Sequence, residues 1–215
     1  MSRKVKKQKK ISPLKGSNLW GLLLFSILLL IDMLTKIAAD AYFSQASAPS
    51  KIDIIPGWIS LRITYNKGIA YGLGTGSATW LKIGVIALTG VLMIGLSILY
   101  FKLDKRRSWI RLALVFVIAG GVGNFIDRVY YQVWDVNAVY GVRDMVDLSR
   151  FGFAVCNFAD FFISGGAVAL VLALLFFDKE AMWPVGKYKA LAKENSADEE
   201  KLEETPDESV DEIHG

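Results

Sequence analysis

The chain has 215 residues, of which 53% are hydrophobic and 12% aromatic, and its formal net charge at neutral pH is +4. A soluble domain of this size has about 45–50% apolar residues even when glycine is counted, whereas here the 19 glycines come on top of the 53%. One cysteine excludes an intramolecular disulfide framework. The single histidine, His214, lies in an acidic tail, which argues against a His-ligated zinc site or a Ser-His-Asp triad. The composition therefore predicts a membrane protein.

Four apolar segments are long enough to cross a membrane as helices, because about 20 residues rising 1.5 Å each span about 30 Å of hydrocarbon. They cover about residues 18–39, 80–101, 109–126 and 158–177. The predicted fold class is an α-helical membrane protein with four transmembrane helices.

The distribution of lysine and arginine predicts the orientation of these helices. Residues 1–17 carry seven basic residues and the connection 102–111 carries five, whereas 40–79 and 127–157 carry three each. We therefore expect a basic cytoplasmic N-terminus at 1–17 and outer loops at 40–79 and 127–157. A cleaved signal peptide is the competing interpretation of the first segment, and the charges near its end argue against it.

The two regions outside the helices differ in character. Residues 59–66 alternate between apolar and polar side chains, which predicts a strand in a small extracytoplasmic β-sheet at the membrane surface. The region 178–215 is charged, and from residue 193 onward it contains ten acidic residues and almost no apolar ones. Such a segment cannot bury a core, so we expect a disordered cytoplasmic tail.

Polar residues gather at the outer ends of the predicted helices. Asp32 and Lys36 have the i, i+4 spacing of a helical ion pair. Charges at membrane depth are costly and usually mark a functional site. A structural interpretation also remains open, because a buried pair, a helix end or an N-cap would use the same residue types. The other residues at this level are Asn124, Asp127, Arg128, Asp144, Asp147, Asn157 and Asp160.

A pair of carboxylates can hydrolyse a peptide bond without histidine, metal or cofactor. Two close carboxylates share a proton, so one can take a proton from water while the other polarises a carbonyl. Three outer carboxylates are candidates, Asp127, Asp144 and Asp160, and their spacing does not select a pair.

Five short segments stand out within about residues 18–177. The segments are DMLTK at 32–36, NKGIAYG at 66–72, GGVGNFIDR at 120–128, VRDMVD at 142–147 and NFAD at 157–160. In these residues and in their order, the chain resembles the lipoprotein signal peptidase (signal peptidase II) family of bacterial membrane aspartic peptidases.

The resemblance implies that Asp144 and Asp160 are the catalytic pair and that no metal or cofactor takes part. Asp32 and Lys36 would then brace the site. The remaining matched residues would bind substrate or support the pair: Asn66, Gly68, Asn124, Asp127, Arg128, Asn157 and Ala159. The chain departs from the family in its long 129–141 segment and in Arg143, which replaces an apolar residue, and Asp147 leaves open which aspartate of its segment is catalytic.

The implied function is an intramembrane aspartic endopeptidase of the bacterial inner membrane, with both termini cytoplasmic and the active site at the outer face. It would remove the signal peptide from a prolipoprotein before the diacylglyceryl-modified cysteine. Its partners would be that substrate and membrane lipids, without nucleic acid, and it would act as a monomer. A small proton-coupled transporter and a non-catalytic membrane scaffold are the alternatives, although a transporter would normally place its charges near the midplane.

Overall fold

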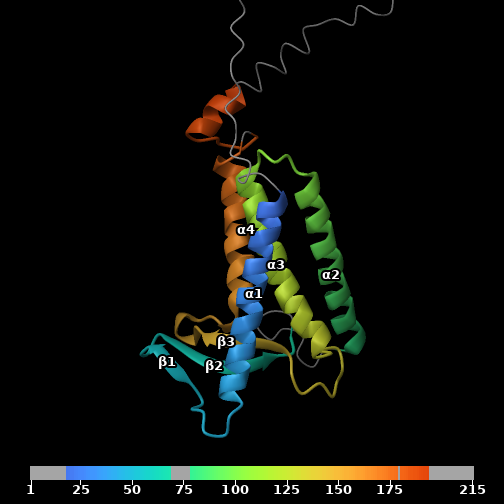
Figure 1. The fold of residues 1–215 in the computed structure, drawn as a ribbon, viewed down its shortest axis with the longest axis vertical. Helices are drawn as coiled ribbons and strands as arrows, with labels where there is room; N and C mark the ends of the chain where they lie inside the picture. Colours follow the sequence, from blue (N-terminus) through green and yellow to red (C-terminus); the bar gives the residue numbers. More distant parts are fainter. Residues whose placement is uncertain (1–17, 69–77, 179, 194–215) are drawn as a thin grey trace, which may run out of the picture.

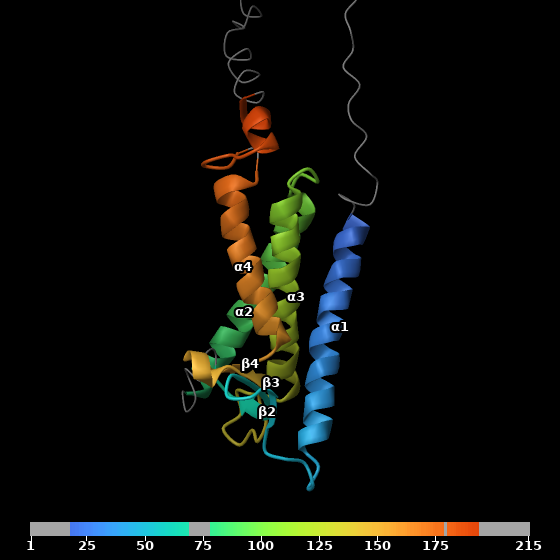
Figure 2. The same cartoon turned by 90° about the vertical axis from the view of Figure 1, so that its left-hand side faces the viewer.

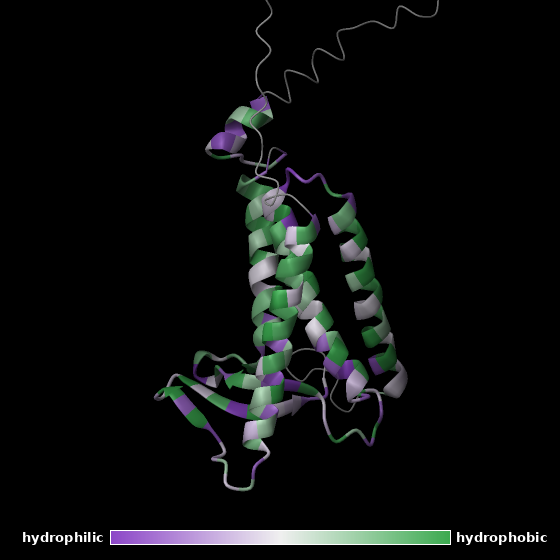
Figure 3. Ribbon diagram, viewed as in Figure 1, coloured by the Kyte–Doolittle hydropathy of each residue, from purple (hydrophilic) through white to green (hydrophobic). Residues whose placement is uncertain are grey.

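The computed structural model describes residues 18–68, 78–178 and 180–193 and shows a helical bundle with a small sheet at one end (Figure 1). The helices are α1 (Asn18–Phe43), α2 (Thr79–Lys102), α3 (Ser108–Tyr130) and α4 (Phe158–Phe176). All four are long and apolar enough to cross a membrane, at 19 to 26 residues each. Apolar residues cover most of the length of the bundle, and hydrophilic residues gather at its two ends (Figure 3). The predicted four-helix membrane fold is confirmed.

Two helices extend beyond their predicted ends. The first was expected to end at 39 and continues to Phe43, and the third was expected to end at 126 and continues to Tyr130. Asp127 suggested a helix end because a carboxylate is costly in lipid. In the structure Asp127 is fully buried and bound by cations of neighbouring elements, so the helix continues past it.

The predicted terminal segments lie largely outside the described residues. These include the basic segment 1–17 and the acidic tail from 194 onward. Within the region 178–215 the structure describes a short helix at 187–193, which the expectation of a disordered tail did not include.

The sheet has four antiparallel strands in the order β1-β2-β3-β4. The strands are β1 (Ile52–Ile55), β2 (Ile59–Asn66), β3 (Val142–Asp147) and β4 (Val155–Cys156). A 3₁₀ turn, η1 (Ser149–Phe151), connects β3 to β4. The strand predicted at 59–66 is β2, and its pairing with β3 brings the segment between α1 and α2 beside the segment between α3 and α4.

Helix α3 is the centre of the bundle, and glycines let its neighbours approach closely. It is the most buried of the four helices, and α1, α2 and α4 all pack against it (Figure 2). A Cβ atom on Gly123 would lie 2.3 Å from Asp32 Oδ2, and one on Gly120 would lie 2.3 Å from the carbonyl oxygen of Ala159. These contacts leave no room for a side chain, so glycine lets α1 and α4 pack directly against the half of α3 nearest the sheet.

Candidate active site

The candidate site residues that the structure describes converge at the sheet end of the bundle. Five helices and strands that are far apart in sequence supply them. Asp32 and Lys36 come from α1, Asn66 from the end of β2, Asn124, Asp127 and Arg128 from α3, Asp144 from β3, and Asn157, Ala159 and Asp160 from the start of α4. Gly68 follows β2, and its backbone N–H donates to Asn66 Oδ1 at 2.9 Å, which orients the Asn66 amide.

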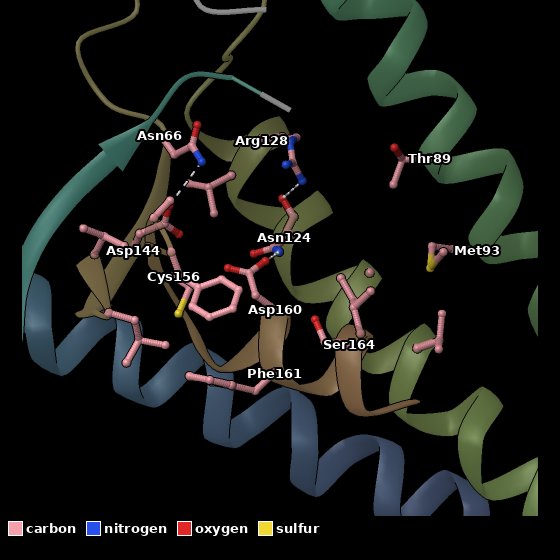
Figure 4. A pocket seen from close by; sticks show the side chains of 18 of the residues that line it. Asn66, Thr89, Met93, Asn124, Arg128, Asp144, Cys156, Asp160, Phe161 and Ser164 are labelled. Atoms are coloured by element: carbon pink, nitrogen blue, oxygen red, sulfur yellow. Dashed lines mark hydrogen bonds between the residues drawn. The ribbon is translucent and has the colours of Figure 1, made fainter. Parts of the chain in front are cut away.

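Asp144 and Asp160 face a common cavity (Figure 4). Asn157 contacts both carboxylates. Asp144 accepts hydrogen bonds from Asn157 Nδ2 at 2.6 Å and from Asn66 Nδ2 at 3.2 Å. Asp160 accepts from Asn124 Nδ2 at 2.8 Å and from the Asn157 backbone N–H at 3.0 Å. Asn157 is also the N-cap of α4, since its side chain accepts from the Asp160 backbone N–H at 3.1 Å. The cap that begins the helix therefore also fixes both carboxylates.

The surroundings of Asp144 favour its protonated form. Burial raises the pKa of this carboxyl to about 7, and the negative charge of Asp160 acts in the same direction. Hydrogen bonds from Asn66 and Asn157 and the charge of Lys36 lower the pKa, but they do not outweigh burial. Asp144 therefore releases its proton less readily than an ordinary aspartate does.

A buried lysine supports the amides that contact the carboxylates. Lys36 is fully buried, and its Nζ donates to Asp32 Oδ2 at 2.8 Å and to Asn124 Oδ1 at 3.0 Å. Asn157 Nδ2 donates to the same Asn124 oxygen at 3.0 Å. With two donors on its oxygen, the Asn124 amide must direct its nitrogen to Asp160. The other oxygen of Asp32 accepts from the Ala159 backbone N–H at 2.9 Å and ties α1 to the start of α4.

Asp127 has a different environment from the other two candidate carboxylates. It is fully buried, and Arg143 binds it with its backbone N–H at 3.0 Å, Nε at 3.3 Å and Nη2 at 2.7 Å. Lys36 Nζ lies 3.7 Å from its Oδ2. Asp127 thus anchors β3 to α3 immediately beside Asp144. In the sequence, Arg143 stands out only as a departure from the family. Its position beside a candidate catalytic aspartate is the sequence feature that indicates such an anchor.

Asp147 is separated from the cavity by its own partners. Its carboxylate accepts from the Ser149 backbone N–H at 2.9 Å and forms an ion pair with Arg62 at 2.9 Å. The Ser149 hydrogen bond is the main cause that lowers the pKa of Asp147. Asp147 therefore has a structural environment, and Asp144 is the aspartate of β3 that faces the cavity.

The cavity has a volume of about 660 Å³ and two kinds of wall (Figure 4). At one end lie the two carboxylates, Asn66 and Arg128, whose Nη1 donates to the Asn124 carbonyl oxygen at 3.3 Å. The remaining wall is mainly apolar and comes from α2, α3, α4, Val142 of β3 and the segment from Leu148 to Cys156. Its members include Leu92, Met93, Val117, Phe161 and Ile163. The cavity can therefore hold an apolar group beside a polar one that reaches the carboxylates.

Four membrane-length helices with a carboxylate pair beside an amphipathic cavity define an integral membrane protein of the hydrolase type. The chain belongs to the signal peptidase II family, because the model described as signal peptidase (SPase) II matches residues 24–176. This membership makes the chain a peptidase and confirms the resemblance noted in its sequence.

Curated relatives agree with this assignment, and solved structures share the fold. The lipoprotein signal peptidase of Fusobacterium nucleatum subsp. nucleatum is 32% identical over 167 residues, which are 77% of this chain and 92% of that protein. The lipoprotein signal peptidase of Streptococcus thermophilus is 36% identical over 124 residues, 57% of this chain and 72% of that protein. A bacterial membrane enzyme solved at 2.3 Å shares the fold, with a TM-score of 0.60, 23% identity, and coverage of 74% of this chain and 88% of that one.

Proposed function

We propose that this chain is a membrane aspartic endopeptidase that removes the signal peptide from diacylglyceryl-modified prolipoproteins before the lipidated cysteine. The observation that carries the proposal is the Asp144–Asp160 pair, held by Asn157 beside one cavity. Family membership supports the substrate, since relatives over most of the chain are lipoprotein signal peptidases. The same membership disfavours a proton-coupled transporter or a passive scaffold.

The two carboxylates have complementary roles in the proposed reaction. Asp160 takes a proton from a water molecule, whose oxygen attacks the scissile carbonyl carbon, while protonated Asp144 donates its proton to the carbonyl oxygen. The tetrahedral intermediate then collapses and its C–N bond breaks. The leaving cysteine nitrogen receives the proton from Asp160, and Asp144 recovers a proton from a hydroxyl of the intermediate. The pair ends in its starting state.

The charges around the site agree with one shared proton. Three cations, Lys36, Arg128 and Arg143, surround four carboxyl groups. Those carboxyl groups are Asp32, Asp127, Asp144 and Asp160. Three positive charges balance the four carboxyl groups only when the catalytic pair retains one proton. Because a buried net charge is costly, this neutral state is favoured. That protonation state is the one the mechanism needs.

The proposed placement puts this site at the outer face of the bacterial inner membrane. Residues 18–177 form the peptidase domain, and the basic segments 1–17 and 102–111 lie in the cytoplasm, as does the region 178–215. The apolar wall of the cavity would receive the signal peptide and acyl chains from surrounding lipid, and the enzyme would act as a monomer.

A cleavage assay tests the proposed function. Purified protein should cleave a diacylglyceryl-modified precursor at the bond before the modified cysteine and should leave the unmodified precursor essentially intact. Equal cleavage of both precursors would contradict the lipid requirement, and cleavage of neither would contradict the proposed activity.

A further inference from the structure

The two edges of the sheet are protected to different degrees. Exposed edges pair with other chains unless charges, proline, bulges or a very short strand limit the pairing. Lys51, which precedes β1, and Asp53 within β1 form an ion pair of 3.3 Å, and the register shifts between Asp53 and Ile55. The segment 153–156, which includes the two residues of β4, reads Phe-Ala-Val-Cys and contains neither charge nor proline. The β1 edge thus carries charges and a register shift, whereas only the short length of β4 limits pairing at the other edge.

The unprotected edge lies at the candidate active site. The residues at this edge are the two of β4, Val155 and Cys156, and the two before them, Phe153 and Ala154; all four line the cavity that contains Asp144 and Asp160. Figure 4 shows Cys156 close to both carboxylates. The segment leads directly into Asn157, the residue that binds the two of them. A chain lying along this edge would therefore reach the catalytic pair.

The backbone of this edge can bind another strand. β4 is last in the sheet order, and its principal neighbour is β3. Successive residues of a strand direct their backbone N–H and C=O groups to opposite sides, so one of the two β4 residues, Val155 or Cys156, directs its groups away from β3. An extended peptide entering the cavity can form main-chain hydrogen bonds with these groups, as in other cases of strand addition.

We infer that the prolipoprotein binds as a fifth strand on the edge formed by residues 153–156, with the paired stretch adjoining the scissile bond. This inference rests on the proposed function and assigns the substrate's binding mode. Main-chain pairing holds an extended peptide whatever its side chains are, so the edge would position the scissile carbonyl while tolerating varied sequences. The apolar wall would hold the lipid separately.

Backbone-modified substrates provide the test. Starting from the diacylglyceryl-modified precursor peptide, each amide N–H within four residues on either side of the scissile bond is replaced in turn by an ester oxygen. Loss of one hydrogen bond should lower kcat/KM about five- to tenfold. We expect such losses at alternate positions on one side of the scissile bond, with the intervening positions near wild type. Uniform tolerance, or losses without alternation, would overturn the inference.

Hydrogen exchange gives an independent readout on the enzyme. With the Asp144→Asn variant and the unmodified-backbone precursor bound, the amides of 153–156 should gain protection and those of β1 should not. Absence of protection at 153–156 would also overturn the inference. If the ester-free precursor is itself not cleaved by the wild-type protein, the proposed function fails; if it is cleaved but the ester series is flat, only the binding mode fails.

Discussion

Replacing Lys36 with methionine would remove the only cation that contacts Asp32 within hydrogen-bonding distance among the described residues. Both side chains are fully buried, and their 2.8 Å ion pair is shielded from water. Asp127 would keep Arg143 as a partner, whereas Asp32 would keep only the Ala159 backbone N–H. The main consequence of Lys36→Met is thus one uncompensated buried carboxylate.

The expected loss is large because the pair is buried. Removing one partner of such a pair costs about 3–5 kcal/mol of the free energy of unfolding. For a chain of this size, each kcal/mol shifts the Tm by about 2–4 °C, so Lys36→Met should lower it by about 6–20 °C. Thermal unfolding of the purified protein in detergent measures this difference. The double variant Lys36→Met/Asp32→Asn should recover much of the loss, since asparagine is uncharged and still accepts from Ala159.

Arg62→Met is the matched control. It removes the 2.9 Å ion pair with Asp147, but the Arg62 side chain is 42% exposed, so the expected loss is below about 1 kcal/mol. If Lys36→Met were no more destabilising than Arg62→Met, the predicted cost of the unpaired buried Asp32 carboxylate would be contradicted. The same would follow if adding Asp32→Asn to Lys36→Met gave no recovery.

Three further predictions concern pH, packing and topology. The pKa of Asp144 rises from 3.8 to about 7 on folding, so the native state holds the proton more tightly and stability should fall as the pH rises from about 4 to 7, by up to about 4 kcal/mol. Thermal melts at pH 4 and pH 8 should show most of this loss, and Asp144→Asn should largely remove it. Equal pH slopes of the two proteins would contradict the pKa. Gly123→Ala should destabilise the protein by about 1–3 kcal/mol, because its Cβ would lie 2.3 Å from a carboxylate oxygen of α1. Gly165→Ala on α4 is the control and should be neutral or stabilising, because its Cβ would have no neighbour within 4 Å. A neutral Gly123→Ala would contradict the close packing. In intact cells, an impermeant thiol reagent should label Tyr140→Cys and not Lys105→Cys, and the reverse pattern would overturn the orientation.

The helices were predictable because a membrane span leaves a local signal of about 20 apolar residues. The ends of the helices were less predictable where the last turn of a helix contains a buried charged residue. The last turn of α3 contains Asp127, whose partners Lys36 and Arg143 come from other elements. Such long-range compensation has no local sequence pattern.

The sheet was only partly predictable for a related reason. β2 alternates apolar and polar residues, whereas β3 has the sequence VRDMVD, with charged residues among its buried positions. Arg143 and Asp144 are acceptable there only because α3 and α4 supply their partners. The strand that carries a candidate catalytic group therefore looked like a polar loop.

The sequence contains three candidate carboxylates for the catalytic pair, and their spacing does not select two of them. The structure distinguishes Asp127, which Arg143 binds, from Asp144 and Asp160, which line the cavity. That distinction depends on which side chains face each other after folding. The spacing of the residues along the chain does not contain it.

The catalytic roles of Asp144 and Asp160 can be tested by measuring cleavage with Asp→Asn variants. Asparagine is nearly isosteric with aspartate but cannot ionise or share a proton, so Asp144→Asn and Asp160→Asn should each lower cleavage of the diacylglyceryl-modified precursor by at least about 10³-fold. The double variant should be scarcely worse than either single one, because the pair acts as a unit. Asp147→Asn should retain substantial activity, since Asp147 binds Arg62 and Ser149 and does not line the cavity. Near-wild-type cleavage by both Asp144→Asn and Asp160→Asn would contradict the aspartic mechanism.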